Sequence, residues 1–267
     1  MSAINIIKAS GEKEVFLESK VRQSLQRAGV KAAIIDKILV NLIGQLYDGI
    51  TTKEIYTKVF ALLNQYQFGD SYRYTLKEAL MALGPSGYPF EKFVARLLNS
   101  LGFHTQTQVI VKGRCIDHEI DVVAEKDNLK FLIECKFHNR PGTKSHSKDV
   151  LYTEGRFEDV TAVNDYHGVW LVTNTKLTQN AVKYGECRGM KLLAWRYPTK
   201  DSLEQLIETY QLYPVTCFAF LEKHQLEILI QNNLVLCSDV LKAPAKKLSG
   251  LGLSSKTLSD LRSIHFS

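Results

Sequence analysis

Several features that mark other classes of protein are missing from this sequence of 267 residues. Its five cysteines are far apart and odd in number, and none form the C-x-x-C pair used by zinc and redox sites. No apolar stretch is long enough to span a bilayer, and charged residues follow the short apolar run at the N-terminus, so no signal peptide is expected. Low-complexity tracts and internal repeats are also absent. We therefore expect reduced thiols, no membrane partner and a soluble cytoplasmic protein.

The charge balance of the chain is mild. Lysine and arginine total 34 against 28 for aspartate and glutamate, which leaves a formal net charge of +6. This surplus permits a partner that carries phosphate groups but does not require one. Because 45% of the residues are apolar, the chain can bury more than one core, and two or three domains are expected.

Turn signals and helical periodicity divide the chain into three parts, which predicts a multidomain α+β protein. Residues 1–84 combine a short hairpin around Ser10 and Gly11 with several helices, and the Gly-Pro-Ser-Gly segment that begins at Gly84 is the predicted boundary. Residues 85–200 alternate between helix and strand patterns, which indicates an α/β domain with a mixed sheet. Residues 201–267 form a helical module of short pieces.

The most informative segment is EIDVVAEKDNLKFLIECKF, residues 119–137, which predicts two strands around a tight turn. If the turn is centred between Asp127 and Asn128, Asp121 lies directly opposite Glu134 in an antiparallel hairpin. Opposed residues have Cβ atoms roughly 4.5 to 5.5 Å apart, and two carboxylates at that spacing repel each other unless a cation or a proton separates them. The pair therefore predicts a divalent metal site.

Lys136 extends the predicted site. It lies two residues beyond Glu134 and points to the same side of the strand, where it can position a water molecule or stabilise charge on a phosphate. Ile133 and Cys135 then face a core. Oxygen ligands favour Mg²⁺ or Mn²⁺, and the absence of an H-E-x-x-H motif disfavours a zinc protease. The alternative is an exposed strand face on which Glu119 pairs with Lys136.

The same segment resembles the core of the PD-(D/E)XK nuclease superfamily, with Asp121 as the motif aspartate and Glu134-Cys135-Lys136 as its E-x-K. The Mrr-like branch, related to type IV restriction endonucleases, has a glutamate on the preceding helix, and Glu91 occupies the matching position. Residues 168–195 resemble the closing strand, helix and strand of that branch. The resemblance implies a restriction-endonuclease-like fold and metal-dependent cleavage of DNA.

This resemblance also implies roles for individual residues. Asp121 and Glu134 bind the metal, Lys136 positions the water, and Glu91 completes the catalytic set. Cationic side chains that follow the E-x-K strand are candidate contacts to DNA phosphates, although a solvated charged surface has the same pattern. They are Lys144, Lys148 and Arg156. Three histidines flank the site and are expected in loops: His118, His138 and His146.

Residues 4–83 resemble the ATP-cone, a nucleotide-sensing domain at the N-terminus of many ribonucleotide reductases. The matching segments are IIKASGEKEVFLESKVRQSL, LYDGITTKEIYTKVFALL and SYRYTL. The nucleotide contacts of the family correspond to Lys8, Lys20, Thr52 and Tyr56. Cationic and backbone donors that converge beside a glycine turn and a helix N-terminus suit a triphosphate. ATP or dATP is therefore the implied regulatory ligand. The alternative is a helical domain that serves only for dimerisation or packing, and dimerisation would make the protein a homo-oligomer.

Residues 237–264 resemble a helix-hairpin-helix unit, in which a Gly-x-Gly turn and the next helix N-terminus bind DNA phosphates without reading sequence. The corresponding residues are Gly250, Gly252 and Lys256. Such units also serve purely as protein contacts. The sequence thus predicts a metal-dependent endodeoxyribonuclease regulated by ATP or dATP. The alternative is a nucleotide-responsive DNA-binding or regulatory protein with an inactive nuclease fold, and RNA or modified DNA stays open as a substrate.

Overall fold

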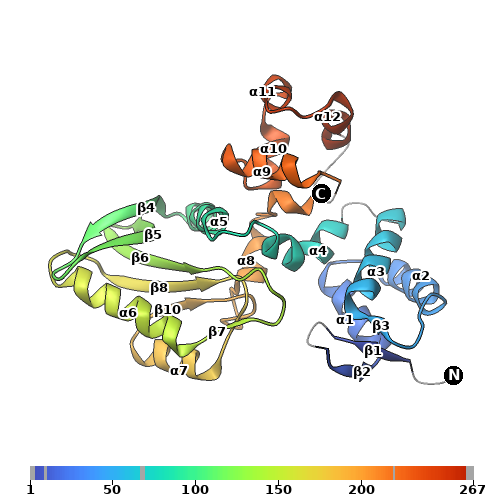
Figure 1. Cartoon of the computed structure of the whole chain (residues 1–267), viewed down its shortest axis with the longest axis horizontal. Coiled ribbons are helices and arrows are strands. Elements are labelled where there is room, and N and C mark those ends of the chain that lie inside the picture. Colours follow the sequence, from blue (N-terminus) through green and yellow to red (C-terminus); the bar gives the residue numbers. More distant parts are fainter. Residues whose placement is uncertain (1–3, 9–10, 67–69, 219, 263–267) are drawn as a thin grey trace. The chain divides into compact units, whose positions relative to one another are not determined.

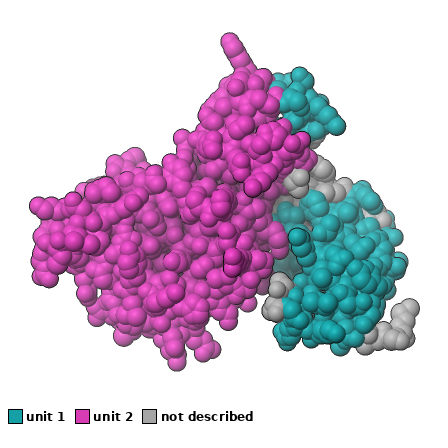
Figure 2. All heavy atoms as spheres, in the orientation of Figure 1, with its two compact units in different colours: residues 1–76, 254–267 teal, residues 77–253 magenta. Residues whose placement is uncertain are grey.

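The computed structural model describes residues 4–8, 11–66, 70–218 and 220–262 (Figure 1). Figure 2 shows its two compact units in different colours. Unit 1 comprises residues 1–76 and 254–267, and unit 2 comprises residues 77–253, so the division falls within helix α4 (Asp70–Met81). No helix in the described part of the chain is long and apolar enough to cross a membrane.

Unit 1 contains a three-stranded sheet in the order β2-β1-β3. Strand β1 (Asn5–Ile7) pairs antiparallel with β2 (Lys13–Val15) and parallel with β3 (Ile50–Thr51). The predicted hairpin is confirmed, although Ser10 of its turn lies outside the described residues. Strand β3 is absent from the prediction because two residues are too few to produce an alternating pattern.

Helical periodicity explains the core of unit 1. Its helices are α1 (Glu18–Arg27), α2 (Ala32–Ile43), α3 (Thr52–Tyr66), the first part of α4, and α12 (Ser255–Arg262). The buried residues of α2 recur every three or four positions and so form one apolar face: Ile35, Ile38, Leu39 and Leu42. Helix α3 begins with a capping box, in which Thr51 Oγ1 accepts from Glu54 N (3.1 Å) and the Glu54 carboxylate accepts from Thr51 N (3.0 Å).

Unit 2 is built on the predicted mixed sheet, whose five strands have the order β10-β8-β6-β5-β4. The strands are β4 (His104–Lys112), β5 (Asp117–Lys126), β6 (Leu129–Lys136), β8 (Gly168–Thr173) and β10 (Lys191–Leu193). The first three pair antiparallel, whereas β8 and β10 continue the sheet in parallel. A separate short pair joins β7 (Lys144–Ser145) to β9 (Lys176–Leu177).

Helices cover both faces of this sheet. Helices α6 (Ser147–Thr161) and α7 (Gln179–Cys187) lie on one side and α5 (Tyr88–Ser100) lies on the other (Figure 1). Val150 and Val160 of α6 share a buried cluster with Leu132 of β6 and Leu171 of β8. These contacts place α6 across the strands that carry the predicted site.

The remaining part of unit 2 is helical, as the sequence predicts. It contains α8 (Leu203–Thr209), a 3₁₀ turn η1 (Val215–Cys217), α9 (Lys223–Gln231), α10 (Cys237–Lys242) and α11 (Ala245–Gly250). Two contacts connect this part to α5: Lys92 donates a hydrogen bond to Asn233, which follows α9, and Arg96 forms an ion pair of 2.6 Å with Asp239 of α10. All five cysteines are free thiols.

Candidate active site

The hairpin formed by β5 and β6 has the register predicted from the sequence. Its two turn residues, Asp127 and Asn128, have positive φ angles of 53° and 61°, as a tight two-residue hairpin turn requires. The ladder runs from the turn to its last rung, Val122 opposite Ile133. The next opposed positions are therefore the predicted carboxylate pair.

Asp121 lies where the sheet pairing is interrupted on both of its sides. Toward β6, Cys135 N donates a hydrogen bond of 2.7 Å to Asp121 Oδ2, beyond the last rung of the ladder. Toward β4, Gln108 has a φ angle of 54° and is left out of the register that pairs its neighbours with β5. The hydrogen bond from the backbone of Cys135 fixes the orientation of the Asp121 carboxylate beside Glu134.

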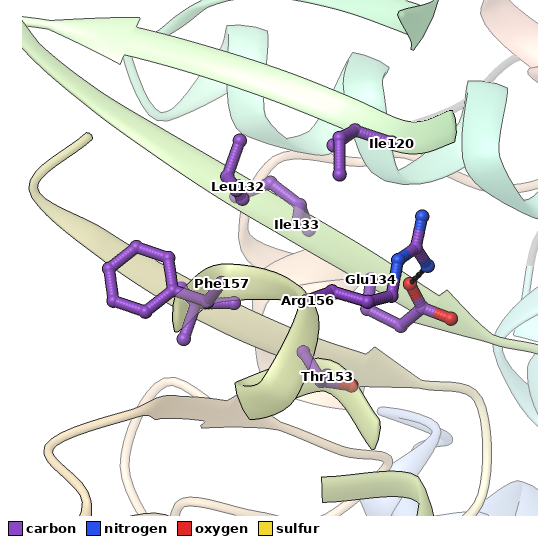
Figure 3. Close-up of a pocket in the computed structure, with 8 residues that line it drawn as sticks. Ile120, Leu132, Ile133, Glu134, Thr153, Arg156 and Phe157 are labelled. Carbon is purple, nitrogen blue, oxygen red and sulfur yellow. Dashed lines mark hydrogen bonds and ion pairs between the residues drawn. The ribbon is translucent and has the colours of Figure 1, made fainter. Parts of the chain in front are cut away.

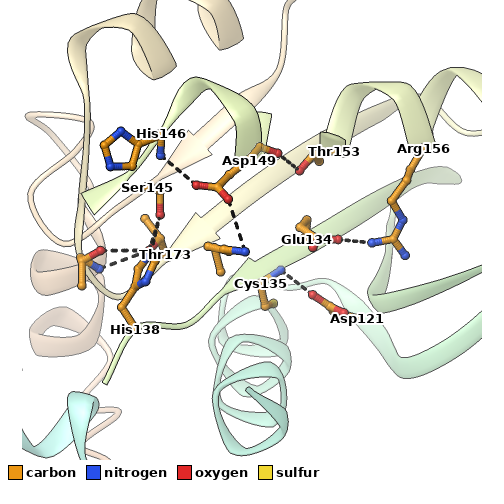
Figure 4. A network of polar contacts seen from close by, with 12 residues as sticks. Asp121, Glu134, Cys135, His138, Ser145, His146, Asp149, Thr153, Arg156 and Thr173 are labelled. Carbon is orange, nitrogen blue, oxygen red and sulfur yellow. Dashed lines mark hydrogen bonds and ion pairs between the residues drawn. The ribbon is translucent and has the colours of Figure 1, made fainter. Parts of the chain in front are cut away.

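Helix α6 supplies a partner for each of the two other predicted residues. Arg156 Nη1 lies 2.5 Å from Glu134 Oε2 (Figure 3). Lys136 Nζ lies 3.3 Å from Asp149 Oδ1. Oδ2 of the same carboxylate accepts a hydrogen bond of 2.8 Å from His146 N, and Figure 4 shows this contact. The side chain of Asp149 is only 8% exposed, so its orientation is fixed by the first turn of α6.

Burial and neighbouring negative charges raise the pKa of each carboxylate of the site. The pKa of Glu134 is raised to about 7, first because burial removes the group from water and second because Asp121 is close. Burial also raises the pKa of Asp121, against the hydrogen bond from Cys135. Glu91, in the first turn of α5, has its pKa raised to about 7 by burial and by the charges of Asp121 and Glu119. Glu91 therefore belongs to the same acidic group, while its catalytic role stays a prediction.

The donor set of this acidic group fits a hard divalent cation. Asp121 and Glu134 offer carboxylate oxygens, and two negative charges that are close together and partly buried are stabilised by a cation between them. Across the residues that the structure describes, no group of three or more His, Cys, Asp and Glu side chains is close enough to hold a metal. Mg²⁺ tolerates such a site, because it keeps several waters and takes oxygens from a substrate phosphate.

The predicted phosphate contacts in unit 2 lie in different surroundings. Lys144 in β7 and Lys148 in the first turn of α6 are exposed. The sequence predicts that Arg156 contacts phosphates from the surface, but its side chain is only 12% exposed. Its guanidinium binds Glu134 and is attracted to the charge of Asp121. Among the described residues, its Nε has no hydrogen-bond partner. Arg156 is therefore part of the acidic group.

Three of the four predicted nucleotide contacts line one pocket of unit 1. Lys20, Thr52 and Tyr56 border a space of about 580 Å³. The other lining residues are mostly apolar: Ile6, Phe16, Leu17, Val21, Ser24 and Ile55. Lys8 is joined to this group through Glu14, because Lys8 Nζ lies 2.6 Å from Glu14 Oε2 and Lys20 binds the other oxygen. Hydrogen bonds from Lys20 and Lys8 lower the pKa of Glu14 to about 2.

The predicted phosphate contacts near the C-terminus are all exposed. Gly250 is the last residue of α11, and Gly252 follows it with a φ angle of 88°. Lys256 lies in the first turn of α12, which Ser254 caps by accepting a hydrogen bond of 3.1 Å from Thr257 N. Glycine at position 252 is explained by the left-handed conformation, which other residues rarely adopt.

The sequence predictions include Lys148 and Arg156 of α6 as phosphate contacts but not Asp149, nor the pairing of Arg156 with Glu134. The signal for Asp149 is present, because an acidic residue at the third position of a helix often caps its N-terminus. The prediction that His118 lies in a loop is wrong, because β5 begins before its apolar residues do and includes His118. The His118 Nε2 atom lies 2.8 Å from Asp159 Oδ2. His138 and His146 lie outside helices and strands, as expected.

Two families match parts of the chain. Residues 84–196 match the family described as restriction endonuclease (Mrr_cat), and residues 213–263 match the family described as AF1548-like, C-terminal. An uncharacterized protein of Archaeoglobus fulgidus is 46% identical to this chain over 166 residues, which make up 61% of this chain and 92% of that protein.

One solved structure gives the same relationship. The crystal structure of AF1548, a protein of unknown function, has 43% sequence identity and a TM-score of 0.60, and the match covers 67% of this chain and 95% of that chain. The MspJI restriction endonuclease in complex with a 27-mer oligonucleotide is a more distant match, with 12% sequence identity and a TM-score of 0.38. That match covers 62% of this chain and 36% of that chain. The chain therefore belongs to the family of the Archaeoglobus fulgidus protein, with a restriction-endonuclease-like domain followed by an AF1548-like C-terminal domain.

Proposed function

We propose that this protein is a divalent-metal-dependent endodeoxyribonuclease that hydrolyses phosphodiester bonds. The observation that carries the proposal is the arrangement of Asp121, Glu134 and Lys136 inside a restriction-endonuclease-like domain. The two carboxylates lie at opposed positions on adjacent strands, both with raised pKa values, and the lysine lies two residues further along β6. Perturbed carboxylates that gather beside a cation are typical of catalytic sites.

In this proposal each side chain has a defined task. Asp121 and Glu134 bind Mg²⁺ or Mn²⁺, which supplies Lewis-acid stabilisation of the phosphate when it is bound. Lys136 donates to the attacking water or to a phosphate oxygen, and Asp149 holds its Nζ in place. Glu91 has a pKa of about 7, so it can accept a proton from the water near neutral pH.

The proposal includes contacts to the DNA backbone. Lys144 and Lys148 are exposed cations on the segments that follow β6, and a phosphate can approach both of them. Arg156, which binds Glu134, would contact a phosphate held at the acidic group. Further contacts are assigned to exposed residues near the C-terminus that resemble a helix-hairpin-helix unit: Gly250, Gly252 and Lys256.

The test is cleavage of plasmid DNA in the presence of Mg²⁺ or Mn²⁺. The wild-type protein should cut, whereas Asp121→Ala and Lys136→Ala should not. Asp165→Ala is the matched control, because Asp165 is a carboxylate with 95% exposure that lies outside the acidic group. Unchanged cutting by both site variants would refute the proposal. Tight DNA binding with no metal uptake in calorimetry would instead support the DNA-binding alternative.

We also propose that ATP or dATP binds in the pocket of unit 1 and regulates the protein. Support comes from the lining, where an apolar wall suits a nucleobase, and from Lys8 and Lys20, whose charges converge on Glu14 and suit a polyphosphate. Calorimetry should detect ATP binding that weakens about tenfold in Lys20→Ala, since a charge-assisted hydrogen bond is lost. Lys31→Ala, at an exposed position of the same unit, should bind as the wild type does. Equal binding by all three proteins contradicts the assignment.

A further inference from the structure

We infer that Tyr152 stacks on an unpaired base of the DNA strand bound at Asp121 and Glu134, so that the nuclease prefers DNA with an unpaired base beside the scissile phosphate. This inference rests on the proposed nuclease function and names its substrate class. Its basis is that an exposed aromatic ring lies on α6, the helix that also carries Asp149 and Arg156, the partners of Lys136 and Glu134.

The ring of Tyr152 is open to solvent. The residue is 62% exposed, and it lies in the middle of α6. Leu151, its neighbour, is also exposed, at 48%. Single apolar residues on a surface are common and need no explanation by themselves. What distinguishes Tyr152 from Leu151 is the set of residues around it.

Tyr152 lies between the two residues that connect α6 to the acidic group. It follows Asp149 by three positions and precedes Arg156 by four, so the three side chains are neighbours on the helix surface. Asp149 binds Lys136 at 3.3 Å and Arg156 binds Glu134 at 2.5 Å. Cζ of Arg156 lies 5.3 Å from the centroid of the Tyr152 ring, within cation–π range. The ring is therefore held beside the carboxylates.

The surface around the ring suits a nucleic acid strand. Lys148 lies one helical turn before Tyr152 and is exposed. Gly155 lies three positions after it, and a Cβ there would meet no atom within 4 Å, so the helix surface is open on that side. A strand can place its phosphates against Lys148 and Arg156 while one base lies on the ring.

Stacking on this ring requires a base that has left the double helix. Within a duplex both faces of each base are covered by its neighbours, and a protein side chain reaches a base face only when that base is unpaired or flipped out. Aromatic stacking is tolerant of sequence because every base has a π face. The ring therefore selects DNA by its local structure.

The experiment compares cleavage of three substrates: a duplex, the same duplex with one unpaired base, and a single strand. Tyr152→Ala should lower kcat/KM on the last two by about tenfold and leave the duplex within about twofold. Tyr152→Phe should retain the wild-type preference, because the ring remains. Leu151→Ala, the matched exposed apolar neighbour, should have no effect on any substrate.

Two results would overturn the inference. Equal activity of Tyr152→Ala and wild type on all substrates would mean that no base uses the ring. An equal loss on all three substrates would mean that Tyr152 only positions Arg156.

Binding separates this inference from the proposed function. Fluorescence anisotropy in the Asp121→Ala background should show weaker binding of single-stranded DNA when Tyr152→Ala is added, with unchanged binding of the duplex. If the wild type cuts no DNA at all, the nuclease proposal fails and this binding difference still decides whether the ring stacks on a base.

Discussion

Two groups of carboxylates in unit 2 have opposite electrostatic surroundings. The site carboxylates, Glu91, Asp121 and Glu134, have raised pKa values because burial and the neighbouring negative charges oppose ionisation. The bracing carboxylates, Glu154 and Asp159, both lie on α6 and have lowered pKa values. The site carboxylates lie on α5, β5 and β6 and the bracing carboxylates lie on α6, and the difference in pKa comes from their immediate partners.

The bracing carboxylates are satisfied by donors from the protein itself. Burial raises the pKa of Glu154, but hydrogen bonds from Tyr184 and Arg188 outweigh this effect and lower the pKa below its usual value. The Asp159 carboxylate binds His118 and accepts a hydrogen bond from Cys115 N at 2.9 Å. Carboxylates of this kind stabilise the fold. Within the part of the chain that the structure describes, the three site carboxylates share only two donors, Cys135 N and Arg156. Their unbalanced negative charge destabilises the free protein and favours the binding of a cation.

The largest expected effect separates chemistry from stability. Asp121→Asn should lower the rate of DNA cleavage at least about 100-fold, because it removes a metal ligand while the amide oxygen still accepts from Cys135 N. Its thermal unfolding temperature should not fall. Glu154→Gln should give the reverse result, with a lower unfolding temperature and an unchanged kcat. The comparison fails if both variants lose stability to the same extent.

The next effect concerns Asp149, a carboxylate that positions Lys136. Asp149→Asn should lower kcat about tenfold and leave KM unchanged, because the lysine loses its charged partner while the helix cap is kept. Steady-state kinetics on a DNA substrate measures this split. Glu158→Gln, at an exposed position of the same helix, is the control and should match the wild type. A rise in KM alone would argue for a role in DNA binding.

Asp159→Asn should lower the unfolding temperature in a pH-dependent way. The folded-state pKa of Asp159 lies below its unfolded value of about 3.9, so its contribution to stability is present above that value and is lost as the pH falls toward the folded pKa. Thermal unfolding followed between pH 7 and pH 3 should show the difference from wild type shrinking below about pH 4. A difference that is constant with pH would mean that the charge of Asp159 is irrelevant.

The smallest effect has the opposite sign. Glu91→Gln should raise the free energy of unfolding by about 1 kcal/mol above pH 7, a value reduced for solvent screening. The folded-state pKa of about 7 exceeds the unfolded value, so stability is lost as the pH rises through this window and the glutamine variant avoids that loss. Denaturant unfolding at pH 8 and pH 4 tests it. Greater stability of the wild type at pH 8 would show that Glu91 has a favourable partner.

Much of the fold and the centre of the site could be predicted because they depend on local signals. The turn residues Asp127 and Asn128 and the alternating strands around them fix the register, and Asp121 and Glu134 follow from it. The helices of both units follow from apolar periodicity. Strand β3 and the β7–β9 pair could not be predicted, since strands of two residues depend on distant partners.

The sequence by itself determined the β5–β6 hairpin and the order of Asp121, Glu134 and Lys136 along it, because a two-residue turn sets strand register without help from the rest of the chain. Only the tertiary structure decided which side chains complete the site. Asp149 and Arg156 reach it because the buried face of α6 packs on the sheet, and neither the capping pattern of Asp149 nor the charge of Arg156 predicts its partner in the site. Packing between distant segments thus gives the site carboxylates few donors, one from Cys135 and one from Arg156, whereas the bracing carboxylates on α6 each bind several donors.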